Sequence, residues 1–144
     1  MKYFYWPLLV VSLIALANCA NMPVLESSED LGFGFHHDVI AEPTASTFEG
    51  IGHFDYLFYR KRRLSQTDKF AVAPSGSAVV YQDGPSGNVF IFRRKGGEIT
   101  PLTQTFIGLV QRFEWHEGSG YILALSEDAK GNKRWTKLGF KPRK

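Results

Sequence analysis

The stretch from Lys69 to Thr103 constrains the fold more than any other part of the chain. It reads KFAVAPSGSAVVYQDGPSGNVFIFRRKGGEITPLT, in which four short runs of β-branched and aromatic residues are separated by clusters of Gly, Pro, Ser and Asp. Such clusters supply the backbone angles that tight turns need, and the runs between them have the length of strands. The stretch therefore predicts an antiparallel meander of four strands.

Similar runs predict strands over most of the chain from His53 onward. They cover residues 53–60 with a continuation through 61–65, then 69–73, 78–82, 88–93, 98–102, 106–115, 121–125 and 133–140. No segment keeps a helical period, so we expect little or no α-helix. The runs 89–92 and 121–125 are apolar at every position, which indicates sheets that are covered on both faces.

The first twenty residues have the composition of an export signal. Lys2 precedes an apolar run over residues 7–17 that is short for a bilayer span. The tetrapeptide Leu16-Ala17-Asn18-Cys19 resembles the lipobox of bacterial lipoproteins, which implies a signal peptide over 1–18, a lipid on Cys19 and a place on the periplasmic face of the outer membrane. Ordinary cleavage near Ala20 into the periplasm, or an uncleaved anchor, is the alternative. Cys19 is the only cysteine, so no internal disulfide forms.

Charge divides the rest of the chain into two parts. Residues 19–50 contain no Lys or Arg and several acids, so we expect an acidic tether with a partly extended arm. Residues 51–144 are expected to form one all-β domain. From Tyr56 onward the chain holds sixteen of its seventeen Lys and Arg residues and seven of its fourteen acids, a surplus of nine positive charges.

Two segments, 70–103 and 112–140, share an order of strand, small turn, apolar strand, Gly-Asn turn and strand. Over about residues 69–140 this order resembles the blades of WD-type and Tol-system β-propellers, with Ala73-Pro74-Ser75-Gly76 in the place of Ser-Pro-Asp-Gly. The resemblance implies two blades, the second completed by the strand at 53–65. We therefore predict an all-β fold of about eight strands, either an antiparallel β-sandwich or a two-blade half-propeller. A homodimer that completes a ring is a further alternative.

Two basic clusters lie at predicted strand ends, Arg60-Lys61-Arg62-Arg63 and Arg93-Arg94-Lys95. Cations interleaved with aromatic residues can bind nucleic acid, but an exported chain meets little of it, so we expect no nucleic-acid partner. An acidic protein surface, anionic lipid or cell-wall polymer fits better, and charged edges that discourage strand pairing are the structural alternative. The candidate partner-binding residues are Arg60, Arg62, Arg63, Ser75, Ser77, Arg93, Arg94, Ser119 and Tyr121.

The serines in this set belong to two Gly-rich loops, 75–77 and 118–121. These loops resemble the Ser-Gly loops that bacterial periplasmic lysozyme inhibitors insert into an enzyme cleft, although ordinary tight turns have the same composition. The hypothesis of function is a non-enzymatic envelope lipoprotein that binds a protein partner, as an immunity or inhibitor protein against a toxin or hydrolase does. The alternative is a structural lipoprotein on anionic cell-wall polymer or lipid.

Motifs for catalysis or metal binding are weak. His36-His37-Asp38 is the one compact set of possible metal ligands, but neighbours on an extended chain point to opposite sides. His116, near Glu114 and Glu117, has the chemistry of a general base, and an envelope hydrolase that uses it is the third hypothesis. We expect no enzyme activity, no cofactor and no metal site.

Overall fold

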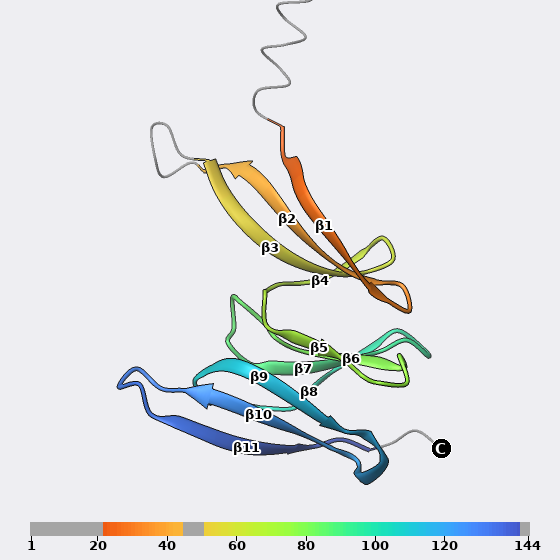
Figure 1. Ribbon diagram of the computed structural model, residues 1–144, viewed down its shortest axis with the longest axis vertical. Coiled ribbons are helices and arrows are strands. Elements are labelled where there is room, and N and C mark those ends of the chain that lie inside the picture. Colours follow the sequence, from red (N-terminus) through yellow and green to blue (C-terminus); the bar gives the residue numbers. More distant parts are fainter. Residues whose placement is uncertain (1–21, 45–50, 142–144) are drawn as a thin grey trace, which may run out of the picture.

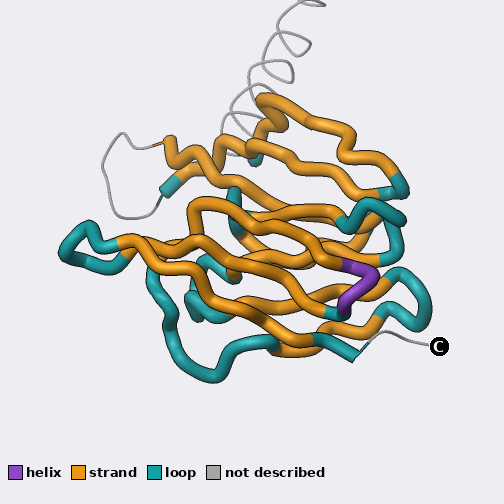
Figure 2. Tube along the Cα trace, turned by 60° about the horizontal axis from the view of Figure 1, so that its bottom comes forward, coloured by secondary structure: helices purple, strands orange, loops and turns teal. Residues whose placement is uncertain are grey.

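The computed structural model describes residues 22–44 and 51–141, and strands make up most of both ranges. The all-β prediction is confirmed. Apart from the short 3-10 turn η1 (Glu117–Ser119), the elements are strands (Figures 1 and 2). They are β1 (Val24–Gly32), β2 (Phe35–Pro43), β3 (Ile51–Tyr59), β4 (Arg62–Gln66), β5 (Phe70–Val72), β6 (Ala78–Gln82), β7 (Val89–Arg93), β8 (Glu98–Pro101), β9 (Leu109–His116), β10 (Tyr121–Glu127) and β11 (Lys133–Gly139).

The strands form three antiparallel meanders. The first sheet has the order β1-β2-β3-β4, the central sheet β5-β6-β7-β8, and the third sheet β11-β10-β9. Figure 1 shows the three sheets stacked along the longest axis of the molecule, with the central sheet between the other two. Because neighbouring strands are consecutive in sequence, most turns are short and lie at the two ends of the strands.

Both faces of the central sheet are covered, as its two-sided apolar strands predict. Side chains of successive strand residues point to opposite faces. Val79 therefore packs with Phe35 and Leu57 of the first sheet, and its neighbour Val80 packs with Ile122 of the third. The stack thus has two apolar cores that share one sheet, and all five residues of β6 are buried.

The third sheet differs from the prediction for residues 121–125. Ile122, Ala124 and Ser126 of β10 are buried toward the central sheet, whereas Tyr121 and Leu123 are only half-buried. Tyr121 and Leu123 belong to the outer face of the third sheet. Among the described residues, β10 is therefore covered only on the face that packs against the central sheet.

The region expected as an acidic tether with a partly extended arm contains a β-hairpin. Residues 24–43 form β1 and β2, and β2 pairs with β3 along nine residues. Phe35 is fully buried at the start of β2, and it anchors the hairpin to the central sheet. None of the nine residues of β1 is buried, so the strand is held mainly by its pairing with β2. The polar composition of β1 hid this strand from sequence reasoning.

The number of strands and the role of residues 53–65 also differ from expectation. Eleven strands are described instead of about eight, and they form three layers instead of two. The expectation that residues 53–65 complete the C-terminal unit is wrong, because β3 and β4 pair within the first sheet. The third sheet consequently has three strands, whereas the other two have four.

A buried amide joins the central sheet to the start of the third. Gln82 is 4% exposed, and its Nε2 donates hydrogen bonds to the carbonyl oxygens of Gly87 (2.9 Å) and Gly108 (2.8 Å). Its Oε1 accepts a hydrogen bond from the N–H of Val110 (2.8 Å). Trp115 Nε1 adds a second link by donating to the carbonyl oxygen of Ala71 (2.9 Å). These bonds fix where β9 lies against the central sheet.

Candidate functional site

Five hairpin turns gather at one end of the stack, which we call the turn end (Figure 1). They join β1 to β2, β3 to β4, β5 to β6, β7 to β8, and β9 to β10. Side chains connect turns of different sheets. The ring of Phe33 lies so close to Gly76 that a Cβ on that glycine would meet it at 2.2 Å, and Arg62 Nη1 donates to the carbonyl oxygen of Gly97 (2.8 Å). The turn end is therefore a continuous surface built by all three sheets.

The two predicted basic clusters meet at the turn end. The β3–β4 turn carries Arg60 and Lys61, and the β7–β8 turn carries Arg94 and Lys95. Arg62 lies between the two turns, since it bonds to Gly97 and its guanidinium lies 5.5 Å from the ring centroid of Phe92. Cations that are separated by about thirty residues in sequence thus form one basic surface.

Aromatic rings hold several of these guanidinium groups in place. Arg60 lies over Tyr59 at 5.3 Å, Arg94 over Phe33 at 5.8 Å, and Arg93 over Phe140 at 6.0 Å. Such cation–π contacts orient the charge. The sequence predicted cations near aromatic residues, but not which ring each cation contacts.

Backbone strain is concentrated in the same place. Among the described residues, two that are not glycine have a positive φ, Phe33 at 56° and Arg60 at 52°. Both lie in turns at the turn end, where the amide of Arg60 donates to the carbonyl oxygen of Gly34 (2.7 Å). A left-handed backbone costs free energy for residues with a Cβ, and such residues cluster at functional sites. The strained residues therefore lie in two turns of the first sheet that flank the basic surface.

The two serine loops lie against each other through Glu117. Its carboxylate accepts hydrogen bonds from Ser77 Oγ (3.2 Å), from the backbone N–H of Ser75 (3.1 Å) and from Ser75 Oγ. Ser75 Oγ also lies 2.9 Å from Ser77 Oγ. Sequence reasoning grouped Glu117 with His116 as a possible catalytic pair. In the structure Glu117 instead orders the loop at 75–77 from the neighbouring sheet.

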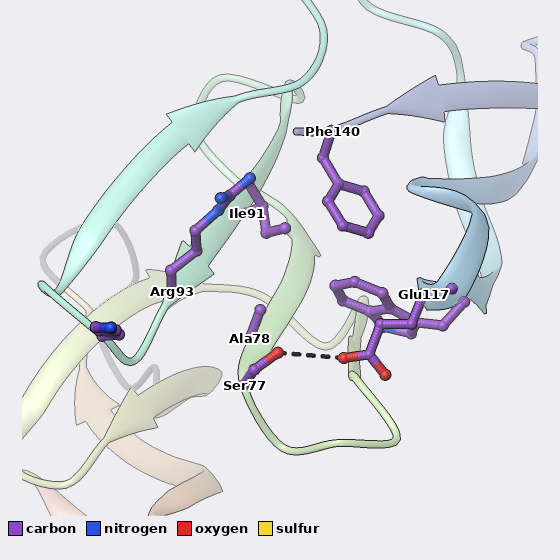
Figure 3. A pocket seen from close by; sticks show the side chains of 9 residues that line it. Ser77, Ala78, Ile91, Arg93, Glu117 and Phe140 are labelled. Carbon is purple, nitrogen blue, oxygen red and sulfur yellow. Dashed lines mark hydrogen bonds between the residues drawn. The ribbon is translucent and has the colours of Figure 1, made fainter. Parts of the chain in front are cut away.

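A pocket of about 510 Å³ opens beside these loops, between the central and third sheets. Its apolar lining includes Ile91, Trp115 and Phe140, and Ser77, Arg93 and Glu117 add polar groups. Figure 3 shows Ser77 and Glu117, joined by their hydrogen bond, across the pocket from Phe140. Such a pocket can take an apolar or aromatic side chain while the cations bind a neighbouring anionic group. Sequence reasoning missed the pocket because its lining comes from both sheets.

Three predicted site residues lie outside the cluster of cations and serines at the turn end. Ser119 is in η1, and Tyr121 begins β10 on the outer face of the third sheet, stacked on His116 with 4.6 Å between ring centroids. Arg63 lies on the outer face of the first sheet, 4.3 Å from the ring centroid of Tyr56. The structure therefore brings together Arg60, Arg62, Arg93, Arg94, Ser75 and Ser77, and separates Arg63 and Tyr121 from them.

Each of the four histidines lies near a carboxylate, and His37 lies near two, Asp55 and Glu29. His37 Nε2 lies 2.8 Å from Asp55 Oδ1, and His116 Nε2 lies 3.2 Å from Glu114 Oε1. His36 stacks on Phe58 and points away from His37, as alternation along β2 requires. Within residues 22–44 and 51–141, no group of three or more His, Cys, Asp or Glu side chains is placed to hold a metal ion.

Several aspartates lie at the end opposite the turn end. A second pocket there is lined in part by Asp55, Asp68 and Asp83. Burial raises the pKa of Asp83, but hydrogen bonds from Ser65 and Ser86 outweigh it and hold the pKa below its usual value of 3.8. Aspartates at this end and the Arg and Lys cluster at the turn end thus give the two ends of the molecule different groups of charged side chains.

Fold and site together define a protein of three packed antiparallel sheets with a basic, pocketed end. No protein-family model matches the chain, and no curated protein is similar to it in sequence. In the part of the chain that the structure describes, no helix is long and apolar enough to cross a membrane. The predicted signal peptide at 1–18 and Cys19 lie outside the described residues.

Proposed function

We propose that this protein is a non-enzymatic domain of the bacterial cell envelope that binds a protein partner through its turn end. The proposal rests on the convergence of Arg60, Arg62, Arg93 and Arg94, the 75–77 loop bonded to Glu117, and a mixed apolar and polar pocket on one surface. Its mechanism is occlusion. The cations attract an acidic surface of the partner. The pocket takes one side chain of the partner as an anchor, while the 75–77 loop fills a cleft in the partner.

The direction of the chain supports this arrangement. β1 runs from Val24 toward the β1–β2 turn, so the chain enters the first sheet at the end opposite the turn end. Only four residues separate Cys19 from Val24 in the sequence. A lipid on Cys19 would therefore hold the opposite end near the membrane and leave the turn end directed away from it. An immunity or inhibitor protein that meets its target in the periplasm needs this orientation.

The alternative, a structural lipoprotein on anionic cell-wall polymer or lipid, uses the same cations without the pocket. The two functions differ in their dependence on salt. Contacts between exposed charges weaken at high ionic strength, whereas an anchor buried in an apolar pocket does not. An envelope hydrolase that uses His116 would need the outer face of the third sheet instead, where His116 contacts Glu114 and Tyr121.

The test is capture of a single partner from envelope extracts by the full chain, at low and at high salt, followed by binding with the purified partner. Arg60→Glu with Arg93→Glu reverses one charge in each basic cluster, and we expect binding to weaken at least about tenfold. Lys69→Glu with Lys130→Glu makes the same change in net charge away from the turn end and should bind normally. Gly118→Phe, at a position with no atom within 4 Å of a built Cβ, is expected to fill the pocket and also weaken binding.

Capture of purified cell wall instead, lost at high salt and insensitive to Gly118→Phe, would favour the structural alternative. Equal loss in the charge-reversal variant and its matched control would contradict a role for the turn end. The identity of the protein encoded beside this one offers an independent check, because a neighbouring toxin or hydrolase is the partner that occlusion requires.

A further inference from the structure

The outer margin of the third sheet differs from every other sheet margin that the structure describes. β1 has two register shifts against β2, β4 has one against β3, and β9 has one against β10 and also contacts β5. β5 has only three residues, and β8 ends at Pro101. Short strands, bulges, proline and charged side chains are common ways to prevent pairing at a sheet edge. β11 has seven residues, no proline and no register shift, so of these devices it has only the charges of Lys133, Arg134 and Lys137.

The phase of the hydrogen bonds shows which groups of β11 face outward. The amide of Phe140 donates to the carbonyl oxygen of Gly120 (3.0 Å), and that of Asp128 donates to Asn132 (3.0 Å). In an antiparallel ladder, residues alternate between bonding to the partner strand and facing away from it. The register between these two bonds therefore identifies the residues whose N–H and C=O groups face the open margin. They are Lys133, Trp135, Lys137 and Gly139.

The side chains along this margin are basic and aromatic. Lys133, Arg134 and Lys137 are exposed, and Trp135 is 43% exposed with Arg112 at 5.2 Å from its ring centroid. Two copies of β11 paired with each other would bring these cations together, and like charges across a strand pair are destabilising. An acidic strand would instead place opposite charges beside them. The charges therefore disfavour self-pairing and favour an acidic partner.

The margin of β11 has room for another strand. A Cβ built on Gly139 meets no atom within 4 Å. The third sheet also has one strand fewer than either of the other sheets. A fourth strand beside β11 would give this sheet the same number.

We propose that β11 is a docking site for an acidic, extended segment of a partner protein, which adds to the third sheet as a fourth strand. Backbone hydrogen bonds to β11 supply affinity, and side chains at alternate positions supply specificity. On the outer face the segment needs acids opposite Lys133 and Lys137, with an apolar residue between them beside Trp135. This surface is separate from the turn end, so the two sites can be tested independently.

The experiment uses the full chain and a short synthetic peptide in which two glutamates flank a valine at alternate positions, with threonine between them. Binding is measured by fluorescence anisotropy, and amide hydrogen exchange is followed by NMR. We expect the amides of Trp135 and Lys137 to exchange quickly in the free protein and slowly with the peptide. Those of Arg134 and Leu138, already bonded to β10, should change little.

Lys133→Glu with Lys137→Glu is expected to weaken peptide binding at least about tenfold, because both reversed charges face the added strand. Lys130→Glu with Lys141→Glu, the matched control outside β11, should leave it unchanged. The turn-end variant Arg60→Glu with Arg93→Glu should also bind the peptide normally, so failure of one site is distinguishable from failure of the other.

Three results would overturn the proposal. The first is the absence of peptide binding. The second is binding that leaves the exchange of Trp135 and Lys137 unchanged, since that is attraction between charges without strand addition. The third is concentration-dependent protection of these amides without peptide, which would assign the margin to a second copy of the chain.

Discussion

Replacing Gln82 by leucine should destabilise the fold far more than the same replacement at an exposed glutamine. Leucine has a similar size but cannot replace the three hydrogen bonds to Gly87, Gly108 and Val110. The bonds to the last two are buried, so the N–H of Val110 and the carbonyl of Gly108 would lose their partners away from water. Each unsatisfied buried group costs about 1–3 kcal/mol, which predicts a loss of about 2–6 kcal/mol in the free energy of unfolding.

Urea unfolding followed by tryptophan emission measures this loss, because Trp115 and Trp135 both lie in the third sheet that Gln82 attaches. Gln111→Leu is the matched control. Gln111 is exposed, its amide donates to the half-buried Glu127, and its replacement should cost no more than about 0.5 kcal/mol. If Gln82→Leu were no more destabilising than this control, the amide would not be the link between the sheets that the geometry indicates.

Two further predictions concern a turn and a carboxylate. Gly76→Ala should lower the free energy of unfolding by at least about 1 kcal/mol, because φ is +73° there and the added Cβ meets the ring of Phe33. Thermal unfolding measures this loss, with Gly118→Ala as the control because the space around Gly118 is open. Equal effects of the two substitutions would contradict the prediction. The depressed pKa of Asp83 means that its carboxylate adds stability above the usual pKa of 3.8, and that this stability is lost as pH falls through the lower folded pKa. Asp83→Asn should therefore make the urea midpoint less dependent on pH in the acid range, and an unchanged dependence would show that Asp83 is not responsible.

The strands flanked by turn-forming residues were predictable from the sequence. Pro74-Ser75-Gly76 and the cluster from Asp83 to Gly87 mark the ends of β6, which was expected at 78–82 and is observed there. β1 and β2 were missed because acids and serines dominate β1. Gly32-Phe33-Gly34 between two nine-residue strands, with buried Phe35 after it, is the signal that would have found this hairpin.

The site was predictable in composition but not in arrangement. The clusters around Arg62 and Arg93 could be found in the sequence because they are continuous runs of charge. The bond between Ser77 and Glu117 joins residues forty apart, and the pocket beside them exists only where two sheets pack. Such contacts depend on how sheets stack, which local sequence patterns do not encode.

The complete burial of β6 limits how this chain can change. Val79 and Val80 contribute to different cores, so β6 offers no position where a new charge would reach water. A shift of pairing by one residue would exchange the side chains that enter the two cores, although both would remain apolar. Correct register therefore depends on the turns that flank β6 and on the amide of Gln82 at its end, so mutations in those turns should produce misfolded chains more readily than apolar exchanges within the strand.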